Sequence, residues 1–418
     1  MIKRKKIIIS CGGTGGHIFP GLEIAKALQR NNSNIDIVFV GASGRMEMEQ
    51  VPKSGFRIIG IWIQGIYRKS IIRNILFPIK LIVSLIQSLI ILLYYRPSAV
   101  IGTGGFASFP VLYVSSFLRI KTYIQEQNCY AGLANKLLSK RAQRIFVAHD
   151  NMHKFFPEKK ILNFGNPVRK SLKIDKVSKT QSRKYFELKE DVFTILIIGG
   201  SLGAGPINRT LEQYISNSSS FDSLSGEVNN LKKDFKDWEQ YAPGMRTNGF
   251  QLIWQTGFQD YNRVCDSIGH SKTDFSVKKQ GMHSKVHFNI NVAVYPFIER
   301  MDLAYKSADI IVSRAGAIAI AEICFLSKAC ILIPSPYVTD NHQKKNAEYL
   351  VKNNASFMID TTSTNYNGQI ELKDLLTKIY SFFKNSKLIN EMGENANNLF
   401  KYNAAEDIAS IVIKDIQN

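Results

Sequence analysis

Cysteine is scarce in this sequence, and its distribution excludes two classes of protein. Five cysteines occur among 418 residues, and no two of them stand in a C-x-x-C spacing. Disulfide-stapled domains and zinc ribbons both require cysteines paired at regular spacing, so neither class fits the chain. Reduced thiols are typical of the cytoplasm, and we therefore expect the protein there.

Acidic residues are few as well. The chain has 34 Asp and Glu against 54 Lys and Arg, which gives a formal charge of +20. Such an imbalance favours anionic partners, namely nucleic acid, acidic lipid or phosphorylated substrates. The drift of an AT-rich genome toward Lys, Ile and Asn explains it equally well, so both explanations stay open.

Long uninterrupted apolar runs are missing. The first run, Ile7–Ile9, is too short for the core of a signal peptide, which agrees with a cytoplasmic protein. The most apolar segment, Ile71–Tyr95, approaches the ~20 residues that cross a bilayer, but Pro78 and several polar residues interrupt it. A buried crossover helix and a helix with one face in a membrane surface are the favoured alternatives to a span. Cations flank or interrupt the segment, as binding to anionic lipid requires: Arg68, Lys69, Arg73, Lys80 and Arg96.

A short strand, a glycine loop and a helical pattern recur along the chain as one unit. The first unit is Ile7–Ser10, followed by the loop Gly12–Gly16 and a helical pattern over Phe19–Gln29. Further strands that lead into such turns are Ala99–Ile101, Thr194–Ile198 and Ile310–Val312. Strands that alternate with helices predict parallel sheets, so we expect an α/β fold.

These units form two groups, separated by a Lys-rich stretch over residues 169–191 that has little apolar periodicity. We therefore expect two doubly wound parallel-sheet domains, residues 1–168 and 169–399. The helical segment at 400–418 is expected to pack back on the first domain. Two polar stretches of the second domain are expected to be surface insertions without a chemical role: residues 211–249 and 265–291.

Glycine loops that open helices are suited to bind phosphate, because backbone N–H groups approach the anion and the helix N-terminus adds positive partial charge. No loop matches G-x-x-x-x-G-K-[ST], and Gly12–His17 does not fit G-x-G-x-x-G, so neither a P-loop nucleotidase nor a nicotinamide enzyme is favoured. His17 stands at the helix entrance, where a neutral imidazole could take a proton from a substrate hydroxyl.

Signals for a metal or cofactor are absent. The chain contains no D-x-D, and its histidine pairs with i,i+4 spacing lack the glutamate of an H-E-x-x-H site. We therefore expect no metal and no cofactor.

Seven motifs follow one another in a fixed order: Gly12–Gly21, Gly102–Phe106, Glu126–Asn128, Gly165–Arg169, Gly199–Ala204, Arg314–Glu322 and Asp340–Ala347. In this combination they resemble the MurG family of bacterial peptidoglycan glycosyltransferases, from Lys5 to about Asp360. The resemblance implies the GT-B fold, in which two Rossmann-like domains face each other across a cleft. The first domain would bind the acceptor and the second the nucleotide sugar.

The resemblance also implies a reaction and its partners. N-acetylglucosamine moves from UDP-N-acetylglucosamine to the C4 hydroxyl of the N-acetylmuramoyl unit of lipid I, with inversion, and the product is lipid II. The implied location is the cytoplasmic face of the inner membrane, where the protein binds an anionic membrane surface peripherally and no nucleic acid.

Residue roles follow from the resemblance, position by position. His17 is implied as the base or the residue that positions it, with Glu126 as an alternative carboxylate. The chain has Gln125 where the family often has His, and Phe106 where it often has Tyr. The implied substrate contacts are Thr14, Gly15 and Gly16 at the phosphates of both substrates, Arg169 and Ser201 at the UDP phosphates, the Ile298 backbone at uracil, Glu322 at ribose, and Asn128, Gln343, Ala317, Ile318, Ala319, Ile320 and Ala321 around the sugar.

Two rivals remain at this stage. One is another GT-B enzyme that uses a UDP-sugar on a glycolipid, such as a diacylglycerol glucosyltransferase. The other is a non-catalytic basic module that binds membrane or nucleic acid, although a binder that relies on charge alone needs none of the glycine loops.

Overall fold

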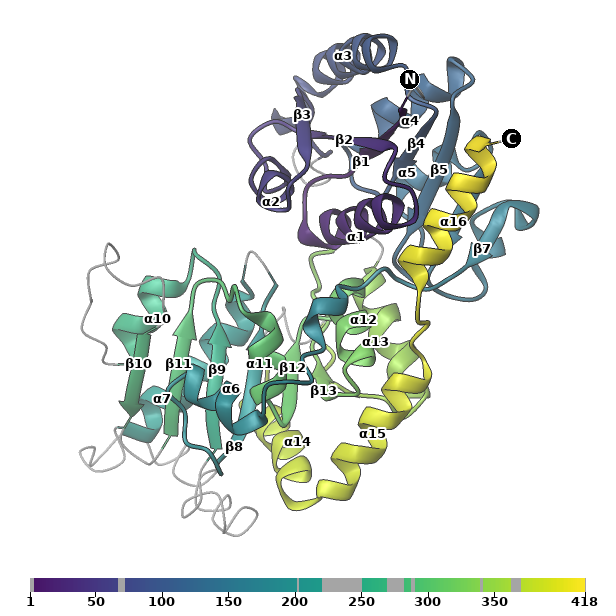
Figure 1. The fold of residues 1–418 in the computed structure, drawn as a ribbon. Coiled ribbons are helices and arrows are strands. Elements are labelled where there is room, and N and C mark those ends of the chain that lie inside the picture. Colours follow the sequence, from purple (N-terminus) through teal and green to yellow (C-terminus); the bar gives the residue numbers. More distant parts are fainter. Residues whose placement is uncertain are drawn as a thin grey trace. The chain divides into compact units, whose positions relative to one another are not determined.

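The computed structural model describes residues 4–66, 72–200, 203–219, 250–268, 282–286, 290–338, 341–361 and 370–417. The chain divides into two compact units (Figure 1). Unit 1 comprises Met1–Arg169 and Phe400–Asn418, and unit 2 comprises Lys170–Leu399. Each unit is described separately below.

The described part of unit 1 contains one sheet of seven parallel strands in the order β3-β2-β1-β4-β5-β6-β7. Their bounds are β1 Lys5–Ser10, β2 Ile35–Ala42, β3 Arg57–Ile61, β4 Ala99–Gly102, β5 Lys121–Glu126, β6 Arg144–Val147 and β7 Ile161–Asn163. In β1, Ile7 and Ile9 face one core and Ile8 faces the other. Helices cover both faces of the sheet, which is why short, continuous apolar runs form its strands.

Two groups of helices provide these covers. One face packs against α1 (Gly15–Asn31), α2 (Glu47–Lys53) and α16 (Ala404–Gln417), and the other against α3 (Phe77–Tyr95), α4 (Ser108–Phe117) and α5 (Leu133–Leu138). The last helix, α16, packs beside α1 (Figure 1). Lys5 Nζ donates to the Ile416 carbonyl at 2.6 Å, so the first strand and the last helix are tied together.

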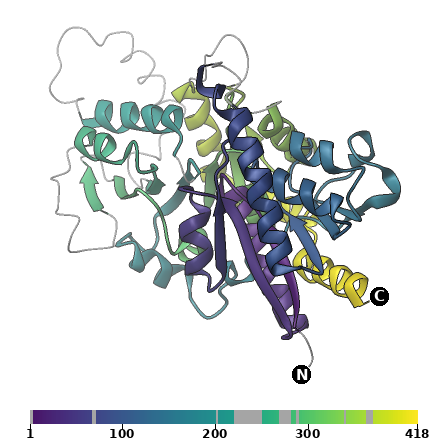
Figure 2. The same cartoon turned by 90° about the horizontal axis from the view of Figure 1, so that it is seen from above.

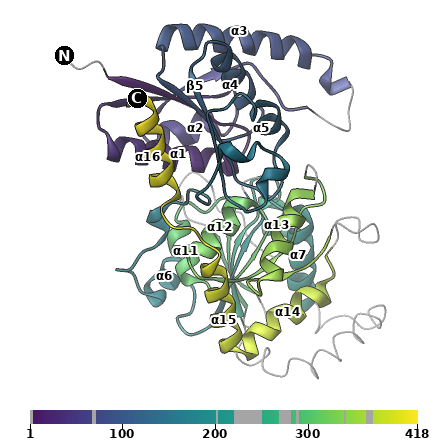
Figure 3. The ribbon, with the colours of Figure 1, turned by 90° about the vertical axis from the view of Figure 1, so that its right-hand side faces the viewer.

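Over much of its length, helix α3 has its polarity reversed relative to an ordinary surface helix, although Ile91 and Leu92 near its end are buried. Its buried residues include Ser84 and Ser88, whereas isoleucines and leucines along its other face are exposed. The helix packs on α4 and runs along the outside of unit 1 (Figures 2 and 3). By length and composition α3 could cross a membrane, but it is an integral layer of unit 1. The expectation of a buried crossover helix is wrong, because most of the apolar surface of α3 faces outward.

The described part of unit 2 contains a second sheet in the order β10-β11-β9-β8-β12-β13-β14. The strands are β8 Phe193–Ile198, β9 Phe250–Gln255, β10 Met282–Val286, β11 Ile290–Tyr295, β12 Ile310–Ser313, β13 Ala329–Leu332 and β14 Phe357–Met358. All neighbours are parallel except β10, which pairs antiparallel with β11 at the edge. The expectation of a purely parallel sheet therefore fails at this one strand.

The α-helices in the described part of unit 2 are α6 Lys179–Tyr185, α7 Gly205–Ser219, α10 Tyr261–Ser267, α11 Met301–Ser307, α12 Ala317–Phe325, α13 His342–Lys352, α14 Leu372–Lys384 and α15 Ser386–Asn398. The expected polar insertions are shorter than the sequence analysis places them. Leu211 and Ile215 of α7 and Cys265 of α10 are buried in the core, and residues 282–286 form β10. Most of the remaining residues of both stretches lie outside the described part of the chain.

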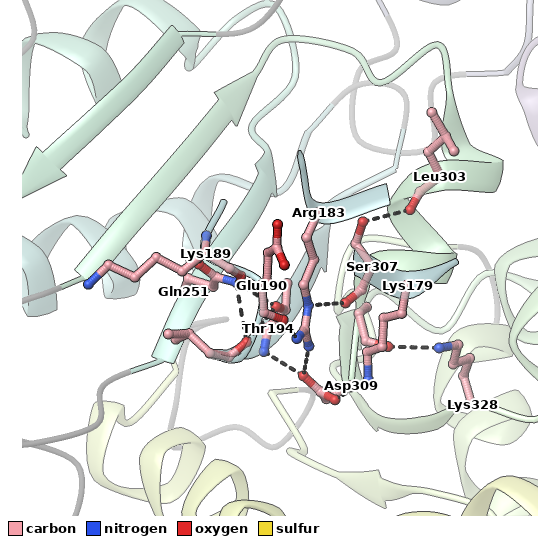
Figure 4. Close-up of polar contacts among 12 residues, drawn as sticks. Lys179, Arg183, Lys189, Glu190, Thr194, Gln251, Leu303, Ser307, Asp309 and Lys328 are labelled. Carbon is pink, nitrogen blue, oxygen red and sulfur yellow. Dashed lines mark hydrogen bonds and ion pairs between the residues drawn. The ribbon is translucent and has the colours of Figure 1, made fainter. Parts of the chain in front are cut away.

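A charged cluster anchors the first helix of unit 2 to its sheet (Figure 4). The Asp309 carboxylate, just before β12, accepts from the Thr194 backbone N–H and from the guanidinium of Arg183, each at 2.6 Å, and pairs with Lys179. Lys328 donates to the Ala308 carbonyl at 2.7 Å. Burial lowers the pKa of Lys328 to about 8. The cluster lies at the amino ends of β8 and β12. It thus fixes α6 at the end of the sheet opposite the carboxyl ends of the strands, where the glycine loops lie.

Candidate functional site

In both units the predicted site residues follow the carboxyl ends of parallel strands, where ligands of open α/β sheets bind. In unit 1 the loops after β1, β4 and β5 supply them. The register pairs Ser10 of β1 with Gly102 of β4, and Gly102 with Ile124 of β5, so the three loops leave the sheet side by side.

His17 lies in the first turn of α1, and Thr14 is the N-cap residue of this helix. Its Nδ1 lies 3.1 Å from the Gly12 carbonyl oxygen and 3.3 Å from Thr14 Oγ1. A carbonyl oxygen only accepts, so the first contact requires the proton on Nδ1 and leaves the lone pair of the neutral ring on Nε2. A hydroxyl that meets Nε2 would therefore meet the basic nitrogen.

Gly104 and Gly105 make room for the imidazole of His17. Both have positive φ, +98° and +80°, which glycine adopts without strain. A Cβ at Gly104 would lie 2.7 Å from His17 Cδ2, and one at Gly105 would lie 2.1 Å from the Gly12 oxygen. The glycine pair of this motif is thus required by close contact with the histidine and its acceptor.

Glu126 is held by four hydrogen bonds. Oε1 accepts from the backbone N–H and side-chain amide of Asn128 at 3.1 and 3.2 Å, and Oε2 accepts from the Gly132 N–H at 2.9 Å and Asn135 Nδ2 at 2.8 Å. The side chain is buried. With both oxygens engaged in this way, Glu126 is better suited to order the loop after β5, and so to position Asn128, than to accept a proton.

Buried amides connect the same loops to each other. Gln127 Nε2 donates to the Thr103 carbonyl at 2.6 Å, and Thr103 Oγ1 donates to the His17 carbonyl at 2.7 Å. Gln125 Nε2 donates to Asn166 Oδ1 at 3.2 Å, and Asn166 Nδ2 donates to the Gln127 carbonyl at 3.0 Å. Gln125, where the sequence departs from the family, is therefore a structural member of this network.

Two further unit 1 positions contact aromatic rings or glycines. The Arg169 guanidinium stacks over the Phe19 ring at 4.6 Å from its centroid, next to the first turn of α1. Phe106 packs against the glycine loop, where a Cβ at Gly13 would lie 3.0 Å from its ring.

In unit 2, Gln255 links two expected donor contacts. Gln255 Nε2 donates to the Gly200 carbonyl at 3.1 Å, and Gln255 Oε1 accepts from the Ile298 backbone N–H at 2.9 Å. The glycine turn after β8 and the loop after β11 are thus tied by one side chain at the end of β9. Ser201, expected at the UDP phosphates, lies outside the described residues.

Helix α12 carries the next group of expected contacts. Gly316 is its N-cap, and Ala317, Ile318, Ala319, Ile320 and Ala321 form its first turns. Glu322 follows in the second turn and is buried, with 5% of its surface exposed. The Tyr305 hydroxyl donates to Glu322 Oε2 at 2.9 Å and so fixes the orientation of the carboxylate.

Gln343 lies at the start of α13, and its Oε1 accepts from the Ser335 backbone N–H at 2.9 Å. Arg314, directly after β12, donates from Nη1 to the carbonyls of Ile333 and Pro334 at 3.1 and 3.0 Å. Burial lowers the pKa of Arg314 to about 10. These contacts hold the loop after β13 that leads to Gln343.

Sequence reasoning missed several residues that hold these loops. Glu47, Gln255 and Tyr305 stand outside the seven motifs, and each meets a motif residue only through the neighbouring strands or helices of the fold. Among the described residues, no group of three or more His, Cys, Asp or Glu is placed to hold a metal ion.

Comparisons with known proteins cover both units. The glycosyltransferase family 28 N-terminal domain matches residues 7–147, and the family 28 C-terminal domain matches residues 194–408. A UDP-N-acetylglucosamine–N-acetylmuramyl-(pentapeptide) pyrophosphoryl-undecaprenol N-acetylglucosamine transferase of Flavobacterium psychrophilum is 38% identical over 100% of this chain and 99% of its own. The protein of the same name from Bacteroides fragilis is 39% identical over 98% of this chain and 95% of its own.

Solved structures share the fold. The crystal structure of Acinetobacter baumannii MurG superposes with a TM-score of 0.65 at 24% identity, covering 98% of this chain and 99% of that one. The UDP-GlcNAc 2-epimerase of Neisseria meningitidis bound to UDP-GlcNAc gives 0.61 at 15% identity, over 98% of this chain and 100% of that one. At these identities the likeness concerns the fold alone.

Proposed function

This chain belongs to the MurG family of UDP-N-acetylglucosamine–N-acetylmuramyl-(pentapeptide) pyrophosphoryl-undecaprenol N-acetylglucosamine transferases, and from that premise we propose how its residues perform the reaction. The enzyme transfers N-acetylglucosamine from UDP-N-acetylglucosamine to lipid I and forms lipid II. The observation that carries this conclusion is the match to these transferases over the whole chain at 38% identity. The diacylglycerol enzyme and the non-catalytic module are set aside for the same reason.

His17 serves as the base on the acceptor side. Its Nε2 carries the lone pair, because Nδ1–H is directed to the Gly12 carbonyl at 3.1 Å. The C4 hydroxyl of the acceptor gives its proton to Nε2, its oxygen bonds to the anomeric carbon of the donor, and the bond from that carbon to UDP breaks with the electron pair on UDP. Attack from the face opposite the leaving group gives inversion.

Phosphate binding in unit 1 falls to the first turn of α1. The backbone N–H groups of Thr14, Gly15 and Gly16 stand at a helix N-terminus with no acidic residue in its first turn. Arg169 contributes a cation beside this turn through its stacking on Phe19.

The uridine and most sugar contacts of the donor are assigned to unit 2. The Ile298 backbone reads uracil, Glu322 takes the ribose hydroxyls in the orientation set by Tyr305, and the first turns of α12 together with Gln343 contact the sugar. The Ile298 N–H donates to Gln255 in this structure, so uracil would replace or share that contact.

Membrane binding is assigned to α3 on the cytoplasmic face of the inner membrane, because the acceptor is a lipid. The exposed apolar face of α3, defined here as Ile79, Ile82, Ile86, Ile90 and Leu93, is suited to dip into a membrane surface. Monomeric proteins rarely expose such a continuous apolar row without a partner. Of the expected lipid-binding cations, Lys80 instead donates to Gln64 Oε1 at 2.6 Å, and Arg68 and Lys69 lie outside the described residues.

An acceptor panel tests the proposal. Release of UDP from UDP-N-acetylglucosamine should require a lipid I analogue and should not occur with diacylglycerol. Release of UDP with diacylglycerol, or no release of UDP with either acceptor, would contradict the assignment.

A further inference from the structure

We propose that Glu47 is a positioning residue that acts on His17 through the Gly12–Gly13 peptide group. This inference rests on the proposed function, because it takes His17 as the base. Glu47 is the first residue of α2, five residues beyond the end of β2, and none of the sequence motifs includes it.

The Glu47 carboxylate is fixed directly beneath the glycine loop. Its side chain is fully buried, Oε1 accepts from the Ala42 N–H at 2.9 Å, and both oxygens accept from the Gly13 N–H at 3.2 and 3.1 Å. Burying a carboxylate is costly unless donors compensate it, and hydrogen bonds to an ionised acceptor are the stronger kind. The charge is therefore held at one place, against one peptide N–H of the loop.

Two glycines create the space for this side chain. A Cβ at Gly12 would lie 2.7 Å from Glu47 Oε1, and a Cβ at Gly41 would lie 2.6 Å from Glu47 Cγ. A side chain at either position would force Glu47 to shift, and a side chain at Gly12 would also meet the Ala107 Cβ at 2.7 Å. Gly12, the first glycine of the motif, thus leaves space for the Glu47 carboxylate, in addition to any role in ligand binding.

One peptide group connects the glutamate to the histidine. The Gly12 carbonyl and the Gly13 N–H belong to the same planar trans peptide and point in opposite directions. Glu47 accepts at the N–H end, and His17 Nδ1 lies 3.1 Å from the oxygen at the other end. Consecutive hydrogen bonds polarise one another, so the carboxylate makes the Gly12 oxygen a stronger acceptor for Nδ1–H.

The consequence for catalysis is a fixed tautomer and a stabilised cation. Nδ1–H stays directed at the Gly12 carbonyl, and Nε2 stays basic. The imidazole gains a positive charge when it takes the proton of the C4 hydroxyl, and the Glu47 carboxylate stabilises this charge through the Gly12–Gly13 peptide group. Glu47 keeps its own charge and takes no proton in this step. In a Ser-His-Asp triad the aspartate performs this service by direct contact with the imidazole. Here a peptide group stands between the two side chains.

The kinetic test uses Glu47→Gln, which keeps the shape of the side chain and removes the charge. We expect kcat to fall about 10- to 100-fold, the range found for residues that orient metal-binding histidines. The loss should be smaller than the ~10⁴-fold loss of a triad aspartate, because a peptide group stands between Glu47 and the imidazole. The KM for the donor and the affinity of the protein for UDP should stay near the wild-type values, because the expected contacts with uracil and ribose, Ile298 and Glu322, lie in unit 2. Glu23→Gln is the matched control, since Glu23 is also a buried carboxylate of unit 1, on α1, paired with Lys26 at 2.8 Å. An unchanged kcat in Glu47→Gln would overturn the proposal.

A double-mutant cycle separates positioning from a general structural role. In the His17→Ala background, adding Glu47→Gln should have little further effect on kcat, because the residue through which Glu47 acts is gone. Losses that multiply would assign Glu47 to the fold alone and contradict the proposal.

The histidine tautomer gives a readout that needs no substrate. In protein labelled with ¹⁵N-histidine, the His17 signals are assigned by their loss in His17→Ala, and wild type should show the proton on Nδ1. In Glu47→Gln the Nε2–H tautomer should gain population. A wild-type His17 that carries its proton on Nε2 would refute the inference, even if Glu47→Gln does not fold. Because this result is independent of turnover, it also distinguishes failure of the inference from failure of the proposed function.

Discussion

At the residue scale, hydrogen-bond donors from other parts of the fold fix the orientation of three buried carboxylates, Glu47, Glu126 and Glu322. Sequence motifs identified Glu126 and Glu322 as candidate site residues. The sequence could not predict that Asn135 and Tyr305 would donate hydrogen bonds to their carboxylates. Glu47 was beyond sequence reasoning, because its contact with Gly13 exists only after β1 and β2 pair. A motif predicts which residues stand at a strand end, whereas the donors that meet them come from elsewhere in the fold.

The donor assignment is tested by Glu322→Ala. We expect the KM for UDP-N-acetylglucosamine to rise by at least about tenfold with a smaller fall in kcat, because a ribose contact lies away from the reacting carbon and contributes mostly uniform binding. Steady-state kinetics with varied donor measure this. Glu348→Ala, an exposed carboxylate on α13, is the control and should resemble wild type. An unchanged donor KM in folded Glu322→Ala would remove Glu322 from the donor site.

His149 predicts how acid affects unit 1. Burial lowers its pKa from 6.5 to about 4, while a backbone hydrogen bond with Gln127 opposes the shift. Between these two pH values the unfolded chain binds a proton that the folded unit does not, so this residue makes the free energy of unfolding decrease as the pH falls from about 6.5 to about 4. In urea unfolding at several pH values, His149→Gln should flatten that decrease. His153→Gln, at an exposed position nearby, should keep it, and identical pH dependence in all three proteins would count against a lowered pKa of the half-buried His149.

At the element scale, the sequence located α3 but not its orientation. Its composition predicted an apolar helix, but composition cannot reveal which face packs inward. The interfacial alternative agrees with the exposed apolar face and stays a prediction. Ser84 and Ser88 satisfy their hydroxyls within the helix, on the Leu81 and Ser84 carbonyls at 2.8 and 2.7 Å. Small residues with internally bonded hydroxyls can therefore face α4, which leaves Ile82, Ile86 and Ile90 exposed.

Replacing Ile82, Ile86 and Ile90 by Ser should weaken binding to phosphatidylglycerol-containing vesicles by at least about tenfold, since burial of an apolar side chain is worth about 1.5 to 3 kcal/mol. These side chains are 59%, 53% and 61% exposed, so the fold should not depend on them. Vesicle co-sedimentation measures the binding. Turnover of a soluble, short-chain lipid I analogue is the control and should be retained. Unchanged vesicle binding would assign the membrane contact to another surface.

At the scale of the whole molecule, alternation of strands and helices was enough to predict two α/β units. The sequence did not predict the antiparallel edge strand β10, because its sequence, MHSKV, is short and polar and lies in a stretch without apolar periodicity. An edge strand is buried less than a central one, so the usual hydrophobic signal is weak there.

Metal independence is a prediction about the complete enzyme. The chain lacks D-x-D, and the helix N-termini and Arg169 are available to the departing diphosphate. Turnover in excess EDTA should therefore stay within about twofold of turnover without it. Loss of activity that magnesium or manganese restores would show that a cation is needed.

The most direct test of the account is the identity of the product. Wild-type protein is incubated with UDP-N-acetylglucosamine and a lipid I analogue, and the new glycosidic bond is examined by NMR. We predict a single N-acetylglucosamine joined through a β bond to the C4 oxygen of the N-acetylmuramoyl unit, formed with inversion from the α-linked donor. An α bond, attachment at another hydroxyl, or release of free N-acetylglucosamine in place of a disaccharide would contradict the account.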